Sequence, residues 1–362
     1  MEYPIHRIDV SSHMIPTDFH ESDGTFEWDS TTIIVVEVFA GDAVGIGYTY
    51  GDVTSARLVD RVFSPLILGA DALATTACWT LMRHAVRNVG RPGIASMAIS
   101  AIDSALWDLK ARLFGVPLVD LFGAVRNGIP IYGSGGFTSY SIQQLEAQLR
   151  GWVNQGMARV KMKIGRNPAE DVQRVRAARA AVGPGVELFV DANGAYSVKQ
   201  AIRFSKEFDQ LGVTWFEEPV SSDDLDGLRL VRQRATPGMD IAAGEYGFEP
   251  EYFRRMLDAQ SVDVVQVDAT RCQGITGFIQ SATLADVQHI PISAHTAPSL
   301  HAHVCCALPG ARHLEYFHDH VRVEEMLFEG VLQPVNGMLV PDRSRPGNGL
   351  EFKRSDAARY AA

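Results

Sequence analysis

The stretch that decides the fold is Arg159-Val-Lys161-Met-Lys163-Ile164, and two runs of the same kind follow it, Glu187-Leu-Phe-Val-Asp191 and Val213-Thr-Trp-Phe-Glu217. Each is a short apolar segment with ionisable side chains in it or at its end. Outward from these three, similar runs occur at residues 129–133, 240–245, 262–268, 290–295 and 313–317, separated by amphipathic stretches. This alternation is typical of parallel strands joined by crossover helices. Eight strands at even spacing, with no G-x-G-x-x-G motif after the first, favour a closed α/β barrel over an open doubly wound sheet.

The segments on either side of this region have a different texture. Residues 5–52 are rich in β-branched and aromatic side chains around a Gly41-Asp42 turn, which predicts a small antiparallel sheet. Between residues 55 and 115 the apolar period becomes helical, and Gly115 and Pro117 end the last helix. The tail from residue 328 is rich in Pro and Gly, and we expect it to pack back on the N-terminal sheet.

The composition and charge of the chain limit which classes of molecule it is expected to bind. The 362 residues are 46% hydrophobic, and 33 basic against 43 acidic residues give a net charge of −10. There is no Lys/Arg-rich run to neutralise a phosphate backbone or an anionic membrane, so we expect neither nucleic acid nor membrane as a partner. The sequence shows no long apolar span and no basic-then-apolar leader, which predicts a cytoplasmic protein. The cysteines at 78, 272, 305 and 306 are too scattered for a disulfide scaffold and are expected to be buried thiols.

Three carboxylates end successive strands of the predicted barrel. Asp191, Glu217 and Glu245 lie at the carboxyl ends of the third, fourth and fifth strands, where a barrel of this kind builds its active site. Unpaired charges are costly in buried strands, so a shared ligand explains the three together. An all-oxygen set suits a hard cation, Mg²⁺ before Zn²⁺. The alternative, acidic strand ends that cap helices or pair with surface lysines, explains any one of them alone but not three in succession.

Basic side chains occupy the neighbouring strands. Lys161 and Lys163 are two residues apart, so both point to the barrel interior, where two ammonium groups beside a cation are expected to lower each other's pKa towards the range of a general base. Solvated lysines on an edge strand are the alternative, which the apolar neighbours disfavour. Asp268 and His295 end the sixth and seventh strands, where the carboxylate can fix the imidazole tautomer and make a second acid/base group. A lone histidine at a strand end is usually structural, so this pair depends on the lysines and carboxylates beside it.

In their order along the chain, these motifs resemble one family. The segments that carry the resemblance are Asn88-Val-Gly-Arg-Pro-Gly93, Val-Lys161-Met-Lys163-Ile-Gly, Val-Asp191-Ala-Asn193-Gly, Phe-Glu217-Glu-Pro, Ala-Gly-Glu245, Val-Asp268-Ala-Thr-Arg with Gly274-Ile-Thr-Gly, Ser-Ala-His295 and Leu-Glu315-Tyr. This ordered set looks like the mandelate racemase subgroup of the enolase superfamily. The resemblance implies a modified (β/α)7β TIM-type barrel over residues 124–327, with an α+β capping domain at residues 1–123 completed by residues 328–362. One departure is Gln273, where the pattern is expected to have glycine.

The resemblance also implies roles for the site residues. Members of this superfamily use a Lys or His base, with magnesium stabilising an enediolate. By position, Lys163 would be one base, and His295 with Asp268 would be the other, on the opposite face of the substrate. Lys161 would steady the substrate carboxylate, and Glu315 would hydrogen-bond its other oxygen. One Mg²⁺ per site is expected, with Mn²⁺ able to substitute.

The resemblance extends to the lining of the pocket. Asn193 and Ser134 are expected in the lining, and His20 and Tyr48 are expected to contact the substrate from two specificity loops of the cap. The same loops contain His13, Asp18 and Tyr50, while Phe19, Phe26 and Trp28 indicate some apolar wall. Polar loop groups suit a polyol, whereas the aromatic rings leave an aryl or smaller hydroxy acid open.

The implied reaction is Mg-dependent abstraction of the proton α to the carboxylate of a small-molecule hydroxy or sugar acid. Two outcomes share the enediolate. Expulsion of a β-hydroxyl gives a 2-keto-3-deoxy acid, and return of a proton to the same carbon gives racemisation or epimerisation. The resemblance favours an acid-sugar (aldonate or aldarate) dehydratase, with a homo-oligomeric assembly, dimer or octamer. A non-catalytic barrel protein is the alternative of another class, and it needs a broken metal or acid/base position that this sequence does not have.

Overall fold

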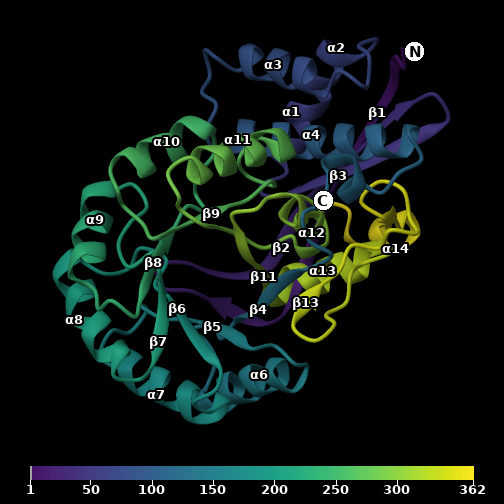
Figure 1. Cartoon of the computed structure of the whole chain (residues 1–362). Coiled ribbons are helices and arrows are strands. Elements are labelled where there is room, and N and C mark those ends of the chain that lie inside the picture. Colours follow the sequence, from purple (N-terminus) through teal and green to yellow (C-terminus); the bar gives the residue numbers. More distant parts are fainter. Residues whose placement is uncertain (1) are drawn as a thin grey trace.

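The computed structural model describes residues 2–362 and has two parts, a barrel and a cap that lies beside it (Figure 1). The cap begins with an antiparallel sheet in the order β1 (Ile5–Ser22), β2 (Glu27–Ala40) and β3 (Ala43–Tyr50). Gly41, at φ +57°, forms the predicted turn between β2 and β3. The register of β1 on β2 shifts between Pro16 and Glu21, so the ladder is irregular near the tip of this hairpin.

Helices pack on this sheet to form the core of the cap. They are α1 (Thr54–Leu58), the π-helical turn η1 (Val59–Phe63), α2 (Ser64–Ile67), α3 (Thr75–Ala85), α4 (Ile94–Leu113) and α5 (Leu118–Phe122). Two glycines of β3 allow α4 to come close to the sheet. A Cβ atom on Gly45 or Gly47 would lie 2.1 Å from a carbonyl oxygen of α4, so a larger residue cannot fit there.

All eight predicted strands are present, and they close into a barrel. They are β4 (Ile129–Gly135), β5 (Arg159–Lys163), β6 (Glu187–Asp191), β7 (Val213–Glu217), β8 (Asp240–Ala243), β9 (Val264–Val267), β10 (Ile292–Ala294) and β11 (Ala311–Phe317). Each pairs with the next, and β11 pairs in parallel with β4 to complete the ring. The predicted carboxyl ends of the fifth, sixth and seventh strands, at Glu245, Asp268 and His295, fall one or two residues beyond β8, β9 and β10, in the first residues of the loops. The predicted barrel with an α+β cap is confirmed.

A helix follows each strand; most of these helices cover the outside of the barrel (Figure 1), whereas the last one contacts the cap sheet through the hydrogen bond from Tyr48 to Glu324. These helices are α6 (Ile142–Asn154), α7 (Asp171–Val182), α8 (Val198–Asp209), α9 (Leu225–Arg234), α10 (Pro250–Asp258), α11 (Gly274–Asp286), α12 (Pro298–Ala307) and α13 (His318–Leu327). Gln273, directly before α11, adopts the left-handed backbone (φ +69°) that glycine usually supplies. Its Nε2 donates to Ser96 Oγ of α4 at 3.1 Å, so this departure from the family pattern makes a contact between barrel and cap.

Inside the barrel, an aromatic floor supports the charged mouth. Trp215 Nε1 donates a hydrogen bond of 2.8 Å to Glu217 Oε2, and Lys161 Nζ lies 5.3 Å from the centre of the Tyr132 ring. The floor therefore contacts the functional residues directly. It is a separate buried cluster of Tyr132, Phe189, Trp215, Ala242 and Val264.

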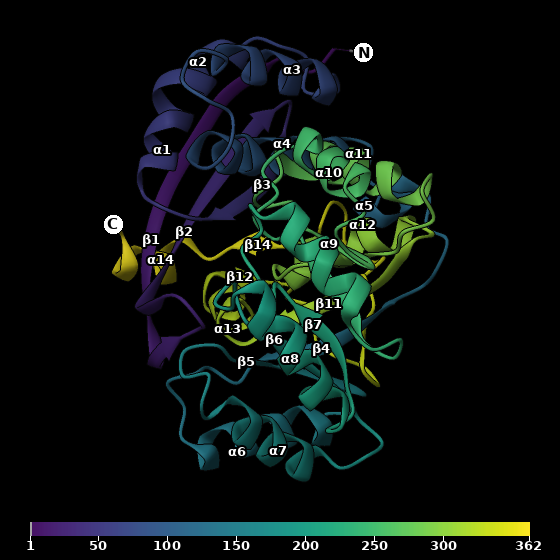
Figure 2. The same cartoon turned by 90° about the vertical axis from the view of Figure 1, so that its left-hand side faces the viewer.

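The tail leaves the barrel after α13 and returns to the cap. β13 (Met338–Leu339) pairs antiparallel with β4, and β12 (Phe328–Glu329) pairs with β14 (Glu351–Phe352). α14 (Arg354–Ala357) and the 3-10 turn η2 (Ala358–Tyr360) then lie beside β1 (Figure 2). There Ser12 Oγ donates to the carbonyl oxygen of Ala362 at 2.9 Å, and His13 Nδ1 lies 3.0 Å from that of Ala357. The domain boundaries at residues 123 and 328 stay predictions.

Two simpler expectations can be compared with the fold. None of the helices within residues 2–362 is both long and apolar enough to cross a bilayer. The four cysteines are buried and form no disulfide, as predicted for this part of the chain. The cytoplasmic location and the homo-oligomeric assembly remain predictions from the sequence.

Candidate active site

Three acidic side chains from neighbouring strands converge at the barrel mouth. Asp191 and Glu217 are register partners at the ends of β6 and β7, and Glu245 follows β8 by two residues. One ligand oxygen of each lies within 4.8 Å of the others, and all three side chains are buried. Buried carboxylates at this separation repel one another, so the arrangement requires positive charge.

The donor set fits a magnesium ion. Oxygen is the ligand that Mg²⁺ prefers, and carboxylates are the donors in this group. Glu245 Oε2 is buried and has no hydrogen-bond partner among residues 2–362, although His295 Nε2 lies 3.3 Å away. An unpaired carboxylate oxygen in the interior is costly, and a coordinated cation removes that cost. Asp191, Glu217 and Glu245 are therefore the residues that could hold the metal.

Lys161 and Lys163 reach this cluster from β5. Lys163 Nζ lies 2.5 Å from Asp191 Oδ2, whereas Lys161 Nζ lies 2.7 Å from Glu315 Oε1 and also contacts Glu217. Burial by itself lowers the pKa of each lysine, but the surrounding carboxylates outweigh burial and raise the pKa of both above its usual value. The charge of Lys161 does lower the pKa of Lys163, as predicted, but the carboxylates outweigh it, so the predicted net shift towards the range of a general base is wrong for this arrangement. Each lysine is neutralised by a carboxylate that the sequence alone did not place against it.

His295 and Asp268 meet on neighbouring strands, as predicted. His295 Nδ1 lies 2.8 Å from Asp268 Oδ2, and Thr270 donates from N and from Oγ1 to Asp268 Oδ1, each at 2.7 Å. Burial alone raises the pKa of Asp268, but the hydrogen bond and charge of His295 hold that pKa below its usual range. An ionised Asp268 keeps a proton on Nδ1 of the imidazole and leaves Nε2 directed towards Glu245.

Glu315, in β11, is enclosed by hydrogen-bond donors. Ser134 Oγ donates to Oε1 at 2.5 Å, and Thr296 N donates to Oε2 at 3.2 Å. Burial raises the pKa of Glu315, but the charge of Lys161 outweighs it, so the pKa ends below its usual value. Ser134 and Lys161 are both fully buried behind this carboxylate. The prediction that Ser134 lines the pocket is therefore wrong in this structure, because its buried hydroxyl bonds Glu315 and does not border the cavity.

A cavity of about 680 Å³ lies between the barrel mouth and the cap. Five of the predicted site residues border it, namely Lys163, Asn193, Glu245, His295 and Glu315. A cavity of this size suits a small molecule. Its remaining walls include Asp23, Phe26, Trp28, Thr31, Tyr50, Met97, Tyr246, Arg271, Phe317 and His320.

Two of the predicted loop contacts do not reach this cavity. Tyr48 is fully buried, and its hydroxyl donates a hydrogen bond of 2.6 Å to Glu324 of α13. Tyr50, on the same face of β3 but two residues nearer the strand end, borders the cavity instead. His20 has 58% of its side chain exposed and lies 3.7 Å from Glu27. The predictions for Tyr48 and His20 are wrong because the depth of a side chain along its strand, and not only its face, decides what it touches.

The cap-side wall combines residues expected from the sequence with one that sequence reasoning missed. The rings of Phe26 and Trp28 stack with their centres 6.2 Å apart and form the predicted apolar wall of the cavity, whereas Phe19 does not border it. His320 was missed, although the run His318-Asp319-His320 directly after the last strand was a signal for it. Its ring stacks on Tyr50 at 3.4 Å. The Tyr50 hydroxyl and His320 Nδ1 both lack hydrogen-bond partners within the described chain, so both are available to a ligand.

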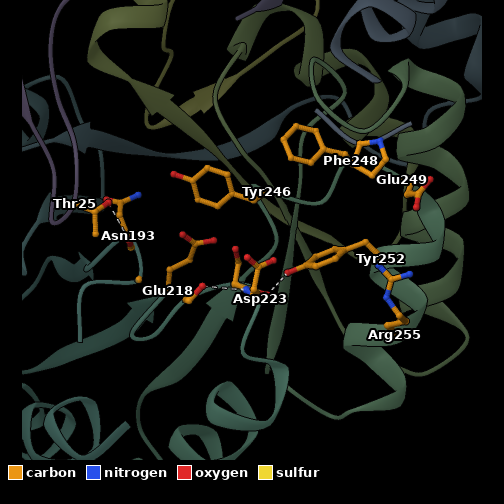
Figure 3. Close-up of a pocket in the computed structure, with 13 residues that line it drawn as sticks. Thr25, Asn193, Glu218, Asp223, Tyr246, Phe248, Glu249, Tyr252 and Arg255 are labelled. Carbon is orange, nitrogen blue, oxygen red and sulfur yellow. Dashed lines mark hydrogen bonds between the residues drawn. The ribbon is translucent and has the colours of Figure 1, made fainter. Parts of the chain in front are cut away.

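A second cavity, of about 570 Å³, adjoins the first, since Asn193 and Tyr246 border both. Figure 3 shows Glu218 and Asp223 beside it, with the rings of Tyr246 and Tyr252 around them. Burial, followed by the charges of Glu245 and Asp191, raises the pKa of Glu218 well above its usual value. The space next to the metal-ligand group is therefore lined by carboxyl and hydroxyl groups, and the environment of Glu218 favours its protonated form.

The backbone adopts unusual conformations next to the site. Asn193, Glu218, Thr296 and Ala297 have φ between +38° and +50°, although none of them is glycine. Each lies within two residues of Asp191, Glu217 or His295. Such conformations cost about 1–3 kcal/mol each and concentrate at functional sites. The strained residues turn the chain sharply where each strand delivers its functional group.

Comparison with known proteins gives the family. Residues 8–123 match the mandelate racemase / muconate lactonizing enzyme N-terminal domain, and residues 144–357 match the enolase C-terminal domain-like family. The 3,6-anhydro-alpha-L-galactonate cycloisomerase of Streptomyces coelicolor is 32% identical over 96% of this chain and 97% of its own length. The L-talarate/galactarate dehydratase of Salmonella typhimurium is also 32% identical, over 90% of this chain and 81% of its own.

Solved structures agree with this result. A mandelate racemase/muconate lactonizing enzyme-like protein from Rubrobacter xylanophilus is 52% identical, with a TM-score of 0.97 over 99% of this chain and 100% of that one. An enolase from Bradyrhizobium, complexed with magnesium and mandelic acid, is 27% identical, with a TM-score of 0.91 over 100% and 99%. Fold, barrel mouth and relatives together define an enzyme of the lyase or isomerase class on a capped TIM-type barrel. The chain belongs to the mandelate racemase subgroup of the enolase superfamily, as its motifs predicted.

Proposed function

We propose that this enzyme removes the proton α to the carboxylate of a small hydroxy or sugar acid with the aid of one magnesium ion. The observation that carries the proposal is that two acid/base groups, Lys163 and His295, border one cavity together with Glu245 of the metal-ligand group. Relatives of similar length that are named as a dehydratase and a cycloisomerase of sugar acids support it. So does the relative that binds magnesium and mandelic acid.

The residues at the barrel mouth would have different roles in this reaction. Asp191, Glu217 and Glu245 would hold Mg²⁺, which supplies Lewis-acid stabilisation of the negative charge that develops on the substrate carboxylate. Lys163 would act as the base on one face, and engagement of Asp191 as a metal ligand would weaken the ion pair that holds the proton on this lysine. His295, oriented by Asp268, serves the other face. Lys161 and Glu315 act behind them, since Lys161 brings positive charge next to the carboxylates of the mouth.

The outcome we favour is dehydration of an aldonate or aldarate to a 2-keto-3-deoxy acid. The α-proton goes to Lys163 or His295, the β-hydroxyl leaves as water with a proton from His295, and the resulting enol gains a proton at the β-carbon and loses its hydroxyl proton to become the keto acid. No electrons are exchanged, so no redox cofactor is needed. The unpartnered polar groups of Tyr50 and His320 suit the hydroxyls of such a chain.

Racemisation or epimerisation of a 2-hydroxy acid is the second candidate. It is favoured by the presence of acid/base groups from different strands and by the stacked rings of Phe26 and Trp28, which suit an aryl substituent. In this case a proton is returned to the same carbon that lost the α-proton.

One substrate panel distinguishes the two outcomes. Aldonates, aldarates and aryl hydroxy acids are incubated with enzyme and magnesium, and keto acid is read with semicarbazide alongside optical rotation and deuterium uptake from solvent. We expect keto acid from a sugar acid, lost in His295→Asn, while Lys163→Ala and His295→Asn lose α-proton exchange from opposite epimers. General acid/base groups contribute about 10²- to 10⁴-fold, so each loss is easily measured. Rotation that decays without keto acid identifies a racemase, and loss of exchange from the same epimer in both variants contradicts the two-base arrangement.

A further inference from the structure

A second group of side chains that could bind a metal lies apart from Asp191, Glu217 and Glu245, between the β1–β2 hairpin and α13. Asp18 and Glu21 belong to β1, and His318 begins α13. One ligand atom of each lies within 4.8 Å of the others, and His318 Nε2 is 3.0 Å from Asp18 Oδ2. Figure 2 shows this end of β1 beside α13. The fold thus brings together ligands from positions 300 residues apart.

Glu21 provides an independent sign that a cation belongs here. The side chain is fully buried, and Trp28 Nε1 donates to its Oε2 at 2.8 Å, but Oε1 has no hydrogen-bond partner among the described residues. A buried carboxylate with an orphaned oxygen is costly unless positive charge meets it.

The nearby arginine, Arg322, donates none of its hydrogen bonds to Glu21. Arg322 donates to Asp319 Oδ1 at 2.6 Å and to the carbonyl oxygen of Pro16 at 2.7 Å. Within the group of Asp18, Glu21 and His318, the one basic side chain is His318, which already faces Asp18. A divalent cation would compensate both carboxylates at once.

The chemistry of the donors indicates which ion. One imidazole nitrogen and two carboxylates suit Zn²⁺ and similar transition-metal ions, whereas the all-oxygen group at the barrel mouth suits Mg²⁺. Three protein ligands leave a fourth position for water. The side chains of Asp18 and His318 are 36% and 26% exposed, so an ion can enter from solvent. We propose that Asp18, Glu21 and His318 form a second metal site, of the zinc type, that ties the hairpin to α13.

Such a site would hold two walls of the active-site cavity in place. Trp28, which borders the cavity, is hydrogen-bonded to Glu21, and Phe317, which also borders it, directly precedes His318. A metal ion between hairpin and helix would therefore fix the position of both rings. The role is structural, and it holds whichever substrate the enzyme takes.

The test measures zinc retained by the full chain after dialysis in excess magnesium, which competes for the oxygen ligands at the mouth. We expect one zinc per chain in the parent and in Glu217→Gln. His318→Gln and Asp18→Asn should lose zinc affinity by at least about 100-fold. Both replaced side chains are partly exposed, so folding should survive even if Glu21→Gln does not fold. Glu27→Gln is the matched control, because Glu27 lies on the same hairpin but pairs with Arg166.

Two further readouts separate a real site from surface binding. Cobalt substituted for zinc should show the absorption of a four-coordinate ion with a nitrogen ligand, and His318→Gln should abolish it. Zinc should also slow amide exchange of residues 17–30 in the parent and in Glu27→Gln, but not in His318→Gln or Asp18→Asn. The proposal is overturned if the parent retains no zinc, or if His318→Gln and Asp18→Asn retain as much as the parent. Loss in Glu217→Gln alone would place the zinc at the barrel mouth and would equally overturn it.

Discussion

The barrel mouth and the cap-side wall of the same cavity are held in different ways. Asp191 and Glu217 are neighbours because β6 and β7 are hydrogen-bonded in register, so the barrel backbone itself sets the distance between them. Trp28 and Tyr50 come from the two cap hairpins, and His320 comes from α13, so that wall depends on side-chain contacts between distant segments. The groups for chemistry are therefore fixed by strand register, while the groups for selectivity can change without moving them.

The largest effect should follow from changing the mouth. Glu217→Gln removes a charge from the metal-ligand group and the partner of Lys161, so we expect magnesium affinity to fall by more than about 100-fold, with a similar or larger loss of turnover. Calorimetry with magnesium and turnover on a productive substrate measure both. Glu187→Gln is the control: Glu187 begins β6, at the far end of the strand from Asp191, and pairs with Arg159 at 2.9 Å. If Glu217→Gln binds magnesium like the parent, the mouth is not the metal site.

A smaller effect on activity is expected from substitutions in the cap-side wall of the cavity, and it should distinguish Tyr50 from Tyr48 of β3. In Tyr50→Phe the lost hydroxyl has no partner within the described protein. We expect kcat/KM to fall about tenfold if that hydroxyl binds substrate, with unchanged magnesium affinity and an unchanged or higher Tm. Tyr48→Phe should lower the Tm and leave kcat/KM unchanged, because it removes the hydrogen bond to Glu324 while leaving the cavity intact. Equal kcat/KM for Tyr50→Phe and the parent on every substrate would show that the wall does not contact the ligand there.

The smallest effect concerns the contact between the two regions. Asp103 of α4 accepts hydrogen bonds from Thr276 N and Oγ1 of α11, at 2.8 and 2.7 Å. Burial raises the pKa of Asp103 from 3.8 to about 7. A raised folded-state pKa contributes stability that is complete below pH 3.8 and is lost as pH rises through 7.

Urea unfolding between pH 5 and 8 checks this sign. From pH 6 to 7 the parent should lose about 1 kcal/mol of unfolding free energy relative to Asp103→Asn, which has no proton to release there. Above pH 8 the difference should become constant. A difference that is already constant from pH 5 would mean that Asp103 is ionised in the folded protein, and the cap would then be joined to the barrel by a charged contact.

The comparison also explains which parts of the site could be predicted from the sequence. Asp191, Glu217 and His295 could be found because each follows an apolar run that can be recognised as a strand. It could not be predicted that Tyr50, and not Tyr48, borders the cavity. The alternation of side chains gives the face of a strand but not the position along the strand at which the cavity begins. The raised pKa of Lys163 depends on a contact with Asp191 from another strand, and the meeting of Asp18 with His318 depends on the closed barrel itself. Such long-range distances have no signature in local pattern.

The return of the tail to β1 has a consequence for the newly made chain. β1 is an edge strand of the cap sheet, and the residues that cover its outer side, around Ala357, lie 344 positions after His13. At about 5–20 residues per second, the ribosome needs roughly 17–70 s to deliver them after β1 has emerged. During that interval the edge of β1 stays open to pairing with another nascent chain. A chaperone that binds extended segments would protect the edge of β1 during this interval, before the barrel has formed.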